Sequence, residues 1–530
     1  MENFNASILA NEKLSFENFR NEVLNDYKIA CISREASLLG RKEVLTGKAK
    51  FGIFGGGKEV AQVAMAKFFK PGDFRSGYYR DQTFHFAIGQ STVRNFFAQL
   101  YADPDIKNDP NSAGRQMVSH FCTPFTNEQG EWLDLVNRKN ISADIAPTAG
   151  QMARGLGLAF ASKSFRNINE LRAFPHLSNN GNEVCFVTIG DAATSEGYFW
   201  ETINAAGVLQ IPLAVFVWDD GFGISVPKNL QTTKGSISDA LSGLQKSENS
   251  NGLNIFKVKG WDYASMCETF DEGIKTAREK HIPVLFHVEE ITQPQGHSTS
   301  GSHERYKSDE RLEWERKWDG LKKMREWMLS NALAADTELD QLEVEAKKYV
   351  IEEKNKAWND YLDPIKEQVN KSAELIKSLA EAIPVKSPVL LNIANELVKN
   401  KEPLRKDVMK SLFAAVNASH NNDAASGVKD YYRELTRENK SIFNSHLLNE
   451  GVKSALKVKE VKAEIAADAP LINGFEVLNK YFDNLFATDP RMIAFGEDLG
   501  YIGDVNQGFS GLQDKHGKHR IFDTGIREQT

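Results

Sequence analysis

The stretch Ile189–Gly197, which reads IGDAATSEG, and the stretch Asp219–Ser225, which reads DDGFGIS, decide the fold of this chain of 530 residues. Residues 183–189 are mostly apolar and β-branched or aromatic, so they predict a buried strand that ends at the first stretch. Residues 211–218 predict a second buried strand, and apolar residues at helical spacing lie between the two. A strand-helix-strand unit of this length is a parallel, right-handed crossover. We therefore expect an α/β fold with a parallel sheet.

The carboxyl ends of the two predicted strands carry candidate metal ligands. Asp191 and Asp220 fall there, at the edge of the sheet where such folds bind ligands. Mg²⁺ prefers one or two carboxylates together with phosphate oxygens and water, and a turn at Gly221 would leave the carbonyl of Phe222 free as a further ligand. Two acidic turn residues without a metal are the alternative, because Asp is common in turns.

The predicted helix after Asp191 offers a phosphate site at its N-terminus. Thr194 or Ser195 is expected to cap this helix, and Glu196 to lie in its first turn, where the helix dipole favours an anion. Free amide groups at such a terminus can bind phosphate. The same strand end is thus predicted to bind both a metal ion and a phosphate group.

These two stretches resemble the thiamin diphosphate motif, and they are most similar to the decarboxylase component of the 2-oxoacid dehydrogenase complexes. That family typically has GDG-x-x-SEG and NNGYAIS, where this chain has GDAATSEG and DDGFGIS. Ala192 replaces a glycine, and Asp219 and Asp220 replace two asparagines, which adds charge beside the diphosphate. The resemblance implies a doubly wound parallel sheet flanked by helices. It also implies that thiamin diphosphate contacts Gly190, Ala192 and Ala193, and that Mg²⁺ is bound by Asp191, Asp220 and Phe222.

Three further segments are similar to the same family. Residues 75–81, RSGYYRD, resemble its YYRD segment, which implies that Tyr79 and Arg80 bind the diphosphate, and Arg suits phosphate as a bidentate fork. By the same resemblance the carbonyl of Thr148, just before a predicted helix of small residues, faces the amino group of the cofactor. His297, in a loop after the predicted strand 284–291, takes the position of a histidine that reaches the reacting carbon. From the residues alone, a surface cation–π pair at Arg80 and a solvated loop histidine stay open.

The end of the chain resembles the second half of the same decarboxylase component, and this half is a separate subunit in many relatives. Residues 473–490 predict a helix, and residues 491–498 predict a strand. The segment TGIREQ places Glu528 where this family and the transketolases have the glutamate that activates the cofactor's pyrimidine ring. That task requires a carboxyl group in a dry site. About sixty residues follow position 468, fewer than the ~100–150 of a doubly wound domain, so the second domain is incomplete or is completed from elsewhere.

The chain divides into four parts by composition. We expect a helical N-terminal segment at 1–50, an α/β domain at 51–335 that binds diphosphate and Mg²⁺, and a helical extension and linker at 336–467. The start of a pyrimidine-binding α/β domain is expected at 468–530. Residues 311–328, RLEWERKWDGLKKMREWM, predict one amphipathic helix.

Composition narrows the class of protein. The formal net charge is −7, and no basic patch suggests a nucleic-acid partner. The four cysteines are scattered without a CxxC pair, which argues against disulfides and zinc. The first residues lack the pattern of a signal peptide, and no run of ~18 apolar residues suggests a membrane span. A cytoplasmic enzyme is therefore expected.

The resemblance implies oxidative decarboxylation of a 2-oxoacid and acylation of the lipoyl group of a dihydrolipoyl acyltransferase. GRQM at 114–117 and HSTSG at 297–301 look more like the branched-chain enzymes, of the 2-oxoisovalerate type, than like the pyruvate enzymes. A homodimer or larger assembly is expected, because the cofactor of this family lies between two domains, commonly from different protomers. A pyruvate dehydrogenase component, a transketolase and a non-catalytic scaffold of such a complex are the alternatives.

Overall fold

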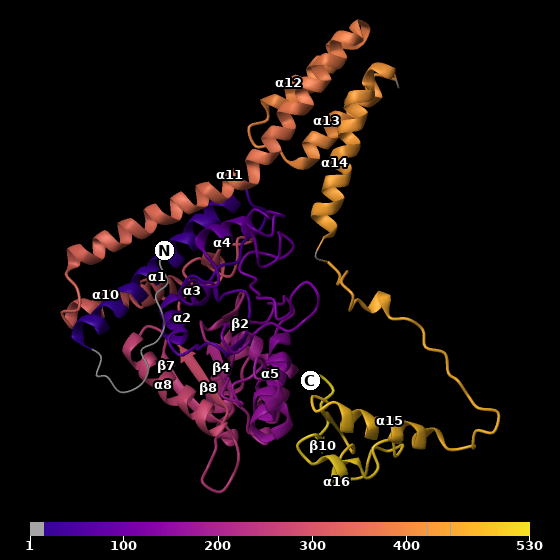
Figure 1. Ribbon diagram of the computed structural model, residues 1–530. Coiled ribbons are helices and arrows are strands. Elements are labelled where there is room, and N and C mark those ends of the chain that lie inside the picture. Colours follow the sequence, from indigo (N-terminus) through magenta and orange to yellow (C-terminus); the bar gives the residue numbers. More distant parts are fainter. Residues whose placement is uncertain (1–14, 421, 446) are drawn as a thin grey trace.

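The computed structural model describes residues 15–420, 422–445 and 447–530 (Figure 1). Its centre is a six-stranded sheet in the order β2-β1-β3-β4-β8-β7, and every neighbouring pair is parallel. The strands are β1 (Phe74–Ser76), β2 (Asn140–Ile141), β3 (Cys185–Gly190), β4 (Leu213–Trp218), β7 (Asn254–Lys259) and β8 (Val284–Glu289). The expected α/β class and both predicted strands, now β3 and β4, are confirmed.

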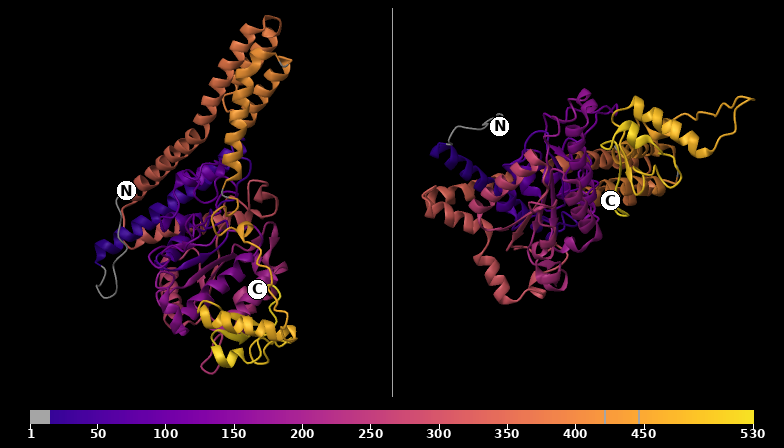
Figure 2. Two further views of the ribbon diagram at one scale, coloured as in Figure 1. Left: turned by 45° about the vertical axis from the view of Figure 1, so that its right-hand side comes forward. Right: turned by 90° about the horizontal axis from the view of Figure 1, so that it is seen from below.

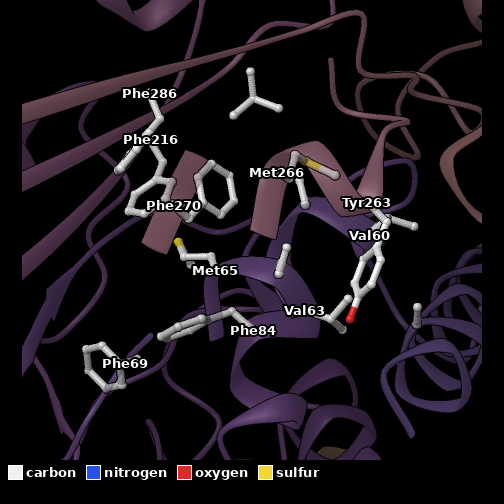
Figure 3. Packing of buried hydrophobic residues seen from close by; sticks show 14 of the residues in the cluster. Val60, Val63, Met65, Phe69, Phe84, Phe216, Tyr263, Met266, Phe270 and Phe286 are labelled. Atoms are coloured by element: carbon white, nitrogen blue, oxygen red, sulfur yellow. The ribbon is translucent and has the colours of Figure 1, made fainter. Parts of the chain in front are cut away.

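Helices cover both faces of this sheet, because its central strands are apolar on both sides. Along β4, Phe216 and Trp218 belong to one hydrophobic cluster and Val215 and Val217 to another, as the two-residue period of a strand requires. Figure 3 shows the first cluster, in which Phe216 packs with aromatic residues and methionines of the helices on that face. The covering helices are α2 (Glu59–Ala66), α3 (Gln82–Ala87), α5 (Gly150–Asn167), α6 (Gly197–Leu209), α7 (Ile237–Ala240) and α8 (Tyr263–Lys280). The helix α4 (Val93–Leu100) packs instead against the long helices described below.

The turn after β3 differs from the sequence prediction. Residues Ala192–Ser195 form a 3₁₀ turn, and α6 begins at Gly197 with Glu196 as its N-cap residue. The hydroxyl of Thr194 donates to the carbonyl of Asp191 at 2.6 Å, so it closes the turn and does not cap the helix. The expected capping by Thr194 or Ser195 is therefore wrong. A small hairpin of β5 (Phe222–Gly223) and β6 (Val226–Pro227) follows β4.

Long helices surround and extend this domain. The helix α1 (Phe16–Leu45) packs along α11 (Asp336–Ala382), which runs for 47 residues. The far part of α11 joins α12 (Ser387–Lys399), α13 (Arg405–Ala418) and α14 (Ser426–Asn444) in an arm with its own hydrophobic core (Figure 1). Within the helical extension and linker expected at 336–467, the described residues up to Asn444 are mostly helical.

The single amphipathic helix predicted over residues 311–328 is wrong. The structure has α9 (Asp309–Lys317) and α10 (Gly320–Ser330), which are separated at Trp318 and Asp319. The carboxylate of Asp319 accepts from the amide of Leu321 at 3.1 Å, so it caps a new helix instead of continuing the old one. Within the described residues, no helix is long and apolar enough to cross a bilayer.

The last residues form a small separate unit beside α5 (Figures 1 and 2). The helix α15 (Gly474–Thr488) and the strand β9 (Ala494–Gly496) confirm both predictions for this region. With α16 (Leu512–His516) and β10 (Ile521–Asp523), they enclose a core of their own. The unit contacts the α/β domain through the ring of Phe160, which lies 5.3 Å from the ring of Phe522.

Candidate active site

A cavity of about 310 Å³ opens at the carboxyl ends of β3 and β4, where the sequence predicts the site. The wall comes from segments that are far apart in the chain, including the 75–81 segment, the start of α5 and the loop after β8. It contains ten of the predicted site residues, namely Tyr79, Arg80, Thr148, Gly190, Asp191, Ala192, Ala193, Asp220, Phe222 and His297. The fold therefore gathers these separate motifs around one space.

Asp191 carries an open ligand position in this cavity. Its side chain is buried, and within the described residues its Oδ2 atom has no hydrogen-bond partner. Burial raises the pKa of Asp191 well above its usual value, and the neighbouring carboxylates of Asp220 and Asp219 raise it further. A cation at Oδ2 would stabilise the charged carboxylate, and so would oppose the pKa increase that burial and the neighbouring carboxylates cause.

The donor set suits Mg²⁺ in particular. Asp191, Asp220 and the carbonyl of Phe222 provide only oxygen atoms, and Mg²⁺ characteristically adds phosphate oxygens and water to one or two carboxylates. In the described part of the chain, no cluster of three or more His, Cys, Asp or Glu residues offers a site built from protein ligands alone. The residues therefore fit a metal ion that arrives together with a diphosphate.

Asp220 is engaged by a residue that sequence reasoning missed. The Nζ atom of Lys58 donates to Asp220 Oδ2 at 3.0 Å and to Gln293 Oε1 at 2.9 Å. The other carboxylate oxygen, Oδ1, accepts from the amide of Phe222 at 3.2 Å. Burial lowers the pKa of Lys58, and the neighbouring Asp220 opposes that shift. The glycine run before Lys58, GGGK at 55–58, is the sequence signal that could have drawn attention to it.

Asp219 is neutralised outside the cavity. Its Oδ2 atom accepts from Lys228 Nζ at 2.8 Å and lies 3.0 Å from His287 Nε2. Burial alone would raise the pKa of Asp219, but the hydrogen bond from His287 and the charge of Lys228 lower it to about 2. Both aspartates that stand where the family motif has asparagine therefore have cationic or hydrogen-bonding partners in the fold.

Ala192, the third departure from the motif, has a matching change across the cavity. The family text NNGYAIS has alanine where this chain has Gly223. A Cβ atom added at Gly223 would lie 2.8 Å from the Cβ atom of Ala192, which is closer than two carbon atoms approach. The methyl group of Ala192 therefore occupies space that Gly223 leaves free.

Arg80 is a buried part of the cavity wall, so the surface cation–π alternative is wrong. Its Nη1 atom donates to the carbonyl of Phe54 at 2.8 Å, and its Nη2 atom donates to the carbonyl of His297 at 2.8 Å. The guanidinium also lies 5.5 Å from the ring of Tyr79. These contacts fix a permanent positive charge beside the cavity, where it can face an anion.

His297 is held as a neutral base. Burial lowers its pKa to about 4, and the positive charges of Arg80 and Lys58 act in the same direction, against the opposing effect of Asp220. At neutral pH its imidazole is therefore uncharged and can accept a proton. The alternative of a solvated loop histidine does not describe this environment.

Glu528 does not reach this cavity. Its side chain is exposed, and it lines a second cavity of about 330 Å³ between α5 and the C-terminal unit, together with Leu156 and Phe495. The environment is not the dry site that the cofactor-activating glutamate requires. Within one chain, the structure therefore keeps Glu528 apart from the ten residues gathered at the first cavity.

Comparisons with known proteins show which family the chain resembles. The dehydrogenase E1 component family matches residues 27–365. The pyruvate dehydrogenase E1 component subunit alpha of Rickettsia bellii is 26% identical over 38% of this chain, which spans 55% of that protein's length. The 2-oxoisovalerate dehydrogenase subunit alpha of Bacillus subtilis is 26% identical over 60% of this chain and 85% of its own. The pyruvate dehydrogenase E1 component subunit alpha of Acholeplasma laidlawii is 27% identical over 64% and 84% respectively.

Proposed function

This chain belongs to the dehydrogenase E1 component family, and we propose that it oxidatively decarboxylates a 2-oxoacid and passes the acyl group to a lipoyl group of a dihydrolipoyl acyltransferase. The observation that carries the proposal is the single cavity that joins Arg80, Asp191 and His297 from three separate motifs. Thiamin diphosphate, which the family implies, would supply an electron sink for the carbanion that decarboxylation creates.

The protein would bind this cofactor through both charge and backbone. Asp191, Asp220 and the carbonyl of Phe222 would hold Mg²⁺, and Mg²⁺ together with Arg80 would offset the negative charge of the diphosphate. Further cavity residues that would contact the cofactor are Tyr79, Thr148, Gly190, Ala192 and Ala193.

His297 would move a proton beside the reacting carbon. Its pKa of about 4 leaves Nδ1 or Nε2 free to accept a proton at neutral pH. The guanidinium of Arg80 donates to the backbone carbonyl of the same residue, which helps to hold His297 in the cavity wall. We assign to His297 proton transfer during decarboxylation and lipoyl acylation.

Glu528 would act in the cavity of a second copy. Because it is exposed and lies in another cavity of its own chain, its role in cofactor activation requires a homodimer or larger assembly. The domain division that goes with this proposal is an N-terminal segment at 1–50, a diphosphate-binding domain at 51–335, an extension and linker at 336–467 and a pyrimidine-binding unit from 468.

A branched-chain substrate of the 2-oxoisovalerate type is our choice among the 2-oxoacids, and the cytoplasm our choice of compartment. GRQM at 114–117 and HSTSG at 297–301 favour this substrate, and the Bacillus subtilis relative is named for 2-oxoisovalerate. The names of other relatives favour pyruvate at similar identity, so pyruvate is the second candidate.

The test is decarboxylation with an artificial electron acceptor, measured on the full-length protein with thiamin diphosphate and Mg²⁺. The substrates are 2-oxoisovalerate, pyruvate and 2-oxoglutarate, and Asp191→Ala and Glu528→Gln are the controls. We expect preference for 2-oxoisovalerate and loss of turnover in both variants. Faster turnover of pyruvate would assign the second candidate substrate, and failure to bind the cofactor would refute the enzyme assignment.

A further inference from the structure

Lys58 is a buried lysine that the fold pairs with the candidate metal ligand Asp220. Its side chain is only 1% exposed, and that of its partner Asp220 only 9%. Its Nζ atom donates hydrogen bonds to two residues of the cavity wall, Asp220 and Gln293. A buried lysine is costly unless it is paired, so this arrangement requires a negative partner.

The backbone before Lys58 adopts a conformation that brings this residue close to Asp220. Gly57 has a φ of +94°, and a Cβ atom at this position would lie 1.9 Å from the carbonyl oxygen of Thr292. A Cβ atom at Gly55 would lie 2.4 Å from the carbonyl oxygen of Arg80. Only glycine therefore lets the turn before α2 approach both the loop after β8 and the 75–81 segment.

Charge balance explains why a lysine is needed at this position. Asp220 stands where the family motif has a neutral asparagine, so it adds one negative charge beside a group that would bind a diphosphate. The ammonium group 3.0 Å away cancels that charge. Asp220 keeps its oxygen atoms as possible metal ligands, while the site as a whole keeps the balance it would have with asparagine.

We propose that Lys58 is a positioning residue that neutralises Asp220 and thereby sets the affinity of this cavity for a metal-bound diphosphate. The inference rests on the proposed function, since it concerns the same cavity and the same cofactor. Lys58 acts through Asp220, and its effect must therefore depend on the charge at position 220.

Three variants separate this role from simple packing. Lys58→Gln leaves Asp220 uncompensated and should weaken binding of thiamin diphosphate with Mg²⁺ by about tenfold or more. Asp220→Asn leaves Lys58 unpaired and should bind metal-free thiamin diphosphate more tightly than the wild type. The double variant Lys58→Gln/Asp220→Asn restores neutrality and should return to within about threefold of wild-type affinity.

The experiment is isothermal titration calorimetry of the full-length protein with thiamin diphosphate, with and without Mg²⁺. Lys67→Gln is the matched control, because Lys67 is ion-paired with Asp26 at the other end of α2, outside the cavity wall. It should lower thermal stability without changing affinity. Melting temperatures without cofactor identify any variant that fails to fold, in which case Asp220→Asn and the double variant still provide the comparison.

The two proposals fail in different ways. If the wild type binds cofactor but Lys58→Gln binds equally well, or if the double variant binds no better than Lys58→Gln, the role of Lys58 is overturned and the proposed function stands. If neither the wild type nor any variant binds thiamin diphosphate with Mg²⁺, the proposed function falls, and the inference about Lys58 falls with it.

Discussion

Arg80 and His297 are joined by a hydrogen bond of 2.8 Å from the guanidinium Nη2 to the main-chain carbonyl, across 217 residues of sequence. Both residues line the same cavity. One side chain thus offers positive charge to the cavity and also fixes the loop that carries the candidate base.

Replacement of Arg80 by lysine should weaken binding of thiamin diphosphate by about tenfold or more, because lysine keeps the charge but loses the bidentate fork. Calorimetry measures the affinity. Arg41→Lys is the matched control, since Arg41 holds the same loop through the carbonyls of Gln295 and Ser298 without lining the cavity. An equal loss in both variants would mean that Arg80 only holds the loop.

The buried ion pairs of Arg75 should be essential for folding stability. Its guanidinium binds Asp81 at 2.5 Å and Asp144 at 2.8 Å, and all three side chains are fully buried. Arg75→Met would leave two buried carboxylates without their ion-pair partner, so we expect the free energy of unfolding to fall by about 3–5 kcal/mol. Urea denaturation measures it. Arg316→Met, in an exposed pair with Glu313, should leave the midpoint almost unchanged, and equal effects would contradict this view.

His281 should make the protein less stable in mild acid. Burial lowers its pKa to about 4, although the hydrogen bond to the carbonyl of Gly181 opposes the shift. The unfolded chain, with a pKa near 6.5, binds the proton more readily, so stability is complete above about pH 6.5 and falls as the pH drops toward 4. The contribution of this residue is roughly 2–3 kcal/mol over that range.

The variant His281→Asn isolates this contribution. Asparagine tolerates the left-handed backbone at this position, where φ is +55°, and it does not titrate. The unfolding free energy of the wild type minus that of the variant, measured between pH 7 and 4, should fall by roughly 2–3 kcal/mol as the pH drops. Curves that run parallel over the whole range would show that His281 does not titrate as described.

Glu528→Gln and Asp191→Ala should complement each other when the two inactive chains are co-expressed. If each cavity takes Glu528 from a second copy, a mixed dimer has one cavity with both residues intact. Random pairing then restores about a quarter of wild-type turnover. Decarboxylation assays of the mixture and of each variant alone measure this, and no gain over the separate variants would place the whole site within one chain.

Local patterns predicted the parts of the site that depend on local structure. Two apolar runs predicted β3 and β4 as parallel neighbours. Because parallel strands end at the same edge of a sheet, the prediction also placed Asp191 and Asp220 close together. The family resemblance then added residues whose positions follow from the same fold, such as Tyr79 and His297.

Two features of the site depend on contacts that no local pattern encodes. Lys58 lies 162 residues from Asp220 in the sequence, so only the packed structure reveals the pair. Glu528 belongs to a unit joined to the domain by a long linker, so its position relative to the first cavity does not follow from a local pattern. The break between α9 and α10 at Asp319 could have been predicted from the sequence, because Asp-Gly inside a helical pattern is a stop and start signal.

The contact between Ala192 and Gly223 couples the side chains that the two positions can carry. A chain with alanine at both positions would be overpacked, since the two methyl carbons would lie 2.8 Å apart. A chain with glycine at both would only lack one methyl group, which a neighbouring loop can absorb. The two positions therefore have room for one methyl group between them, and replacement of Gly223 by alanine in this chain requires glycine at position 192 as well.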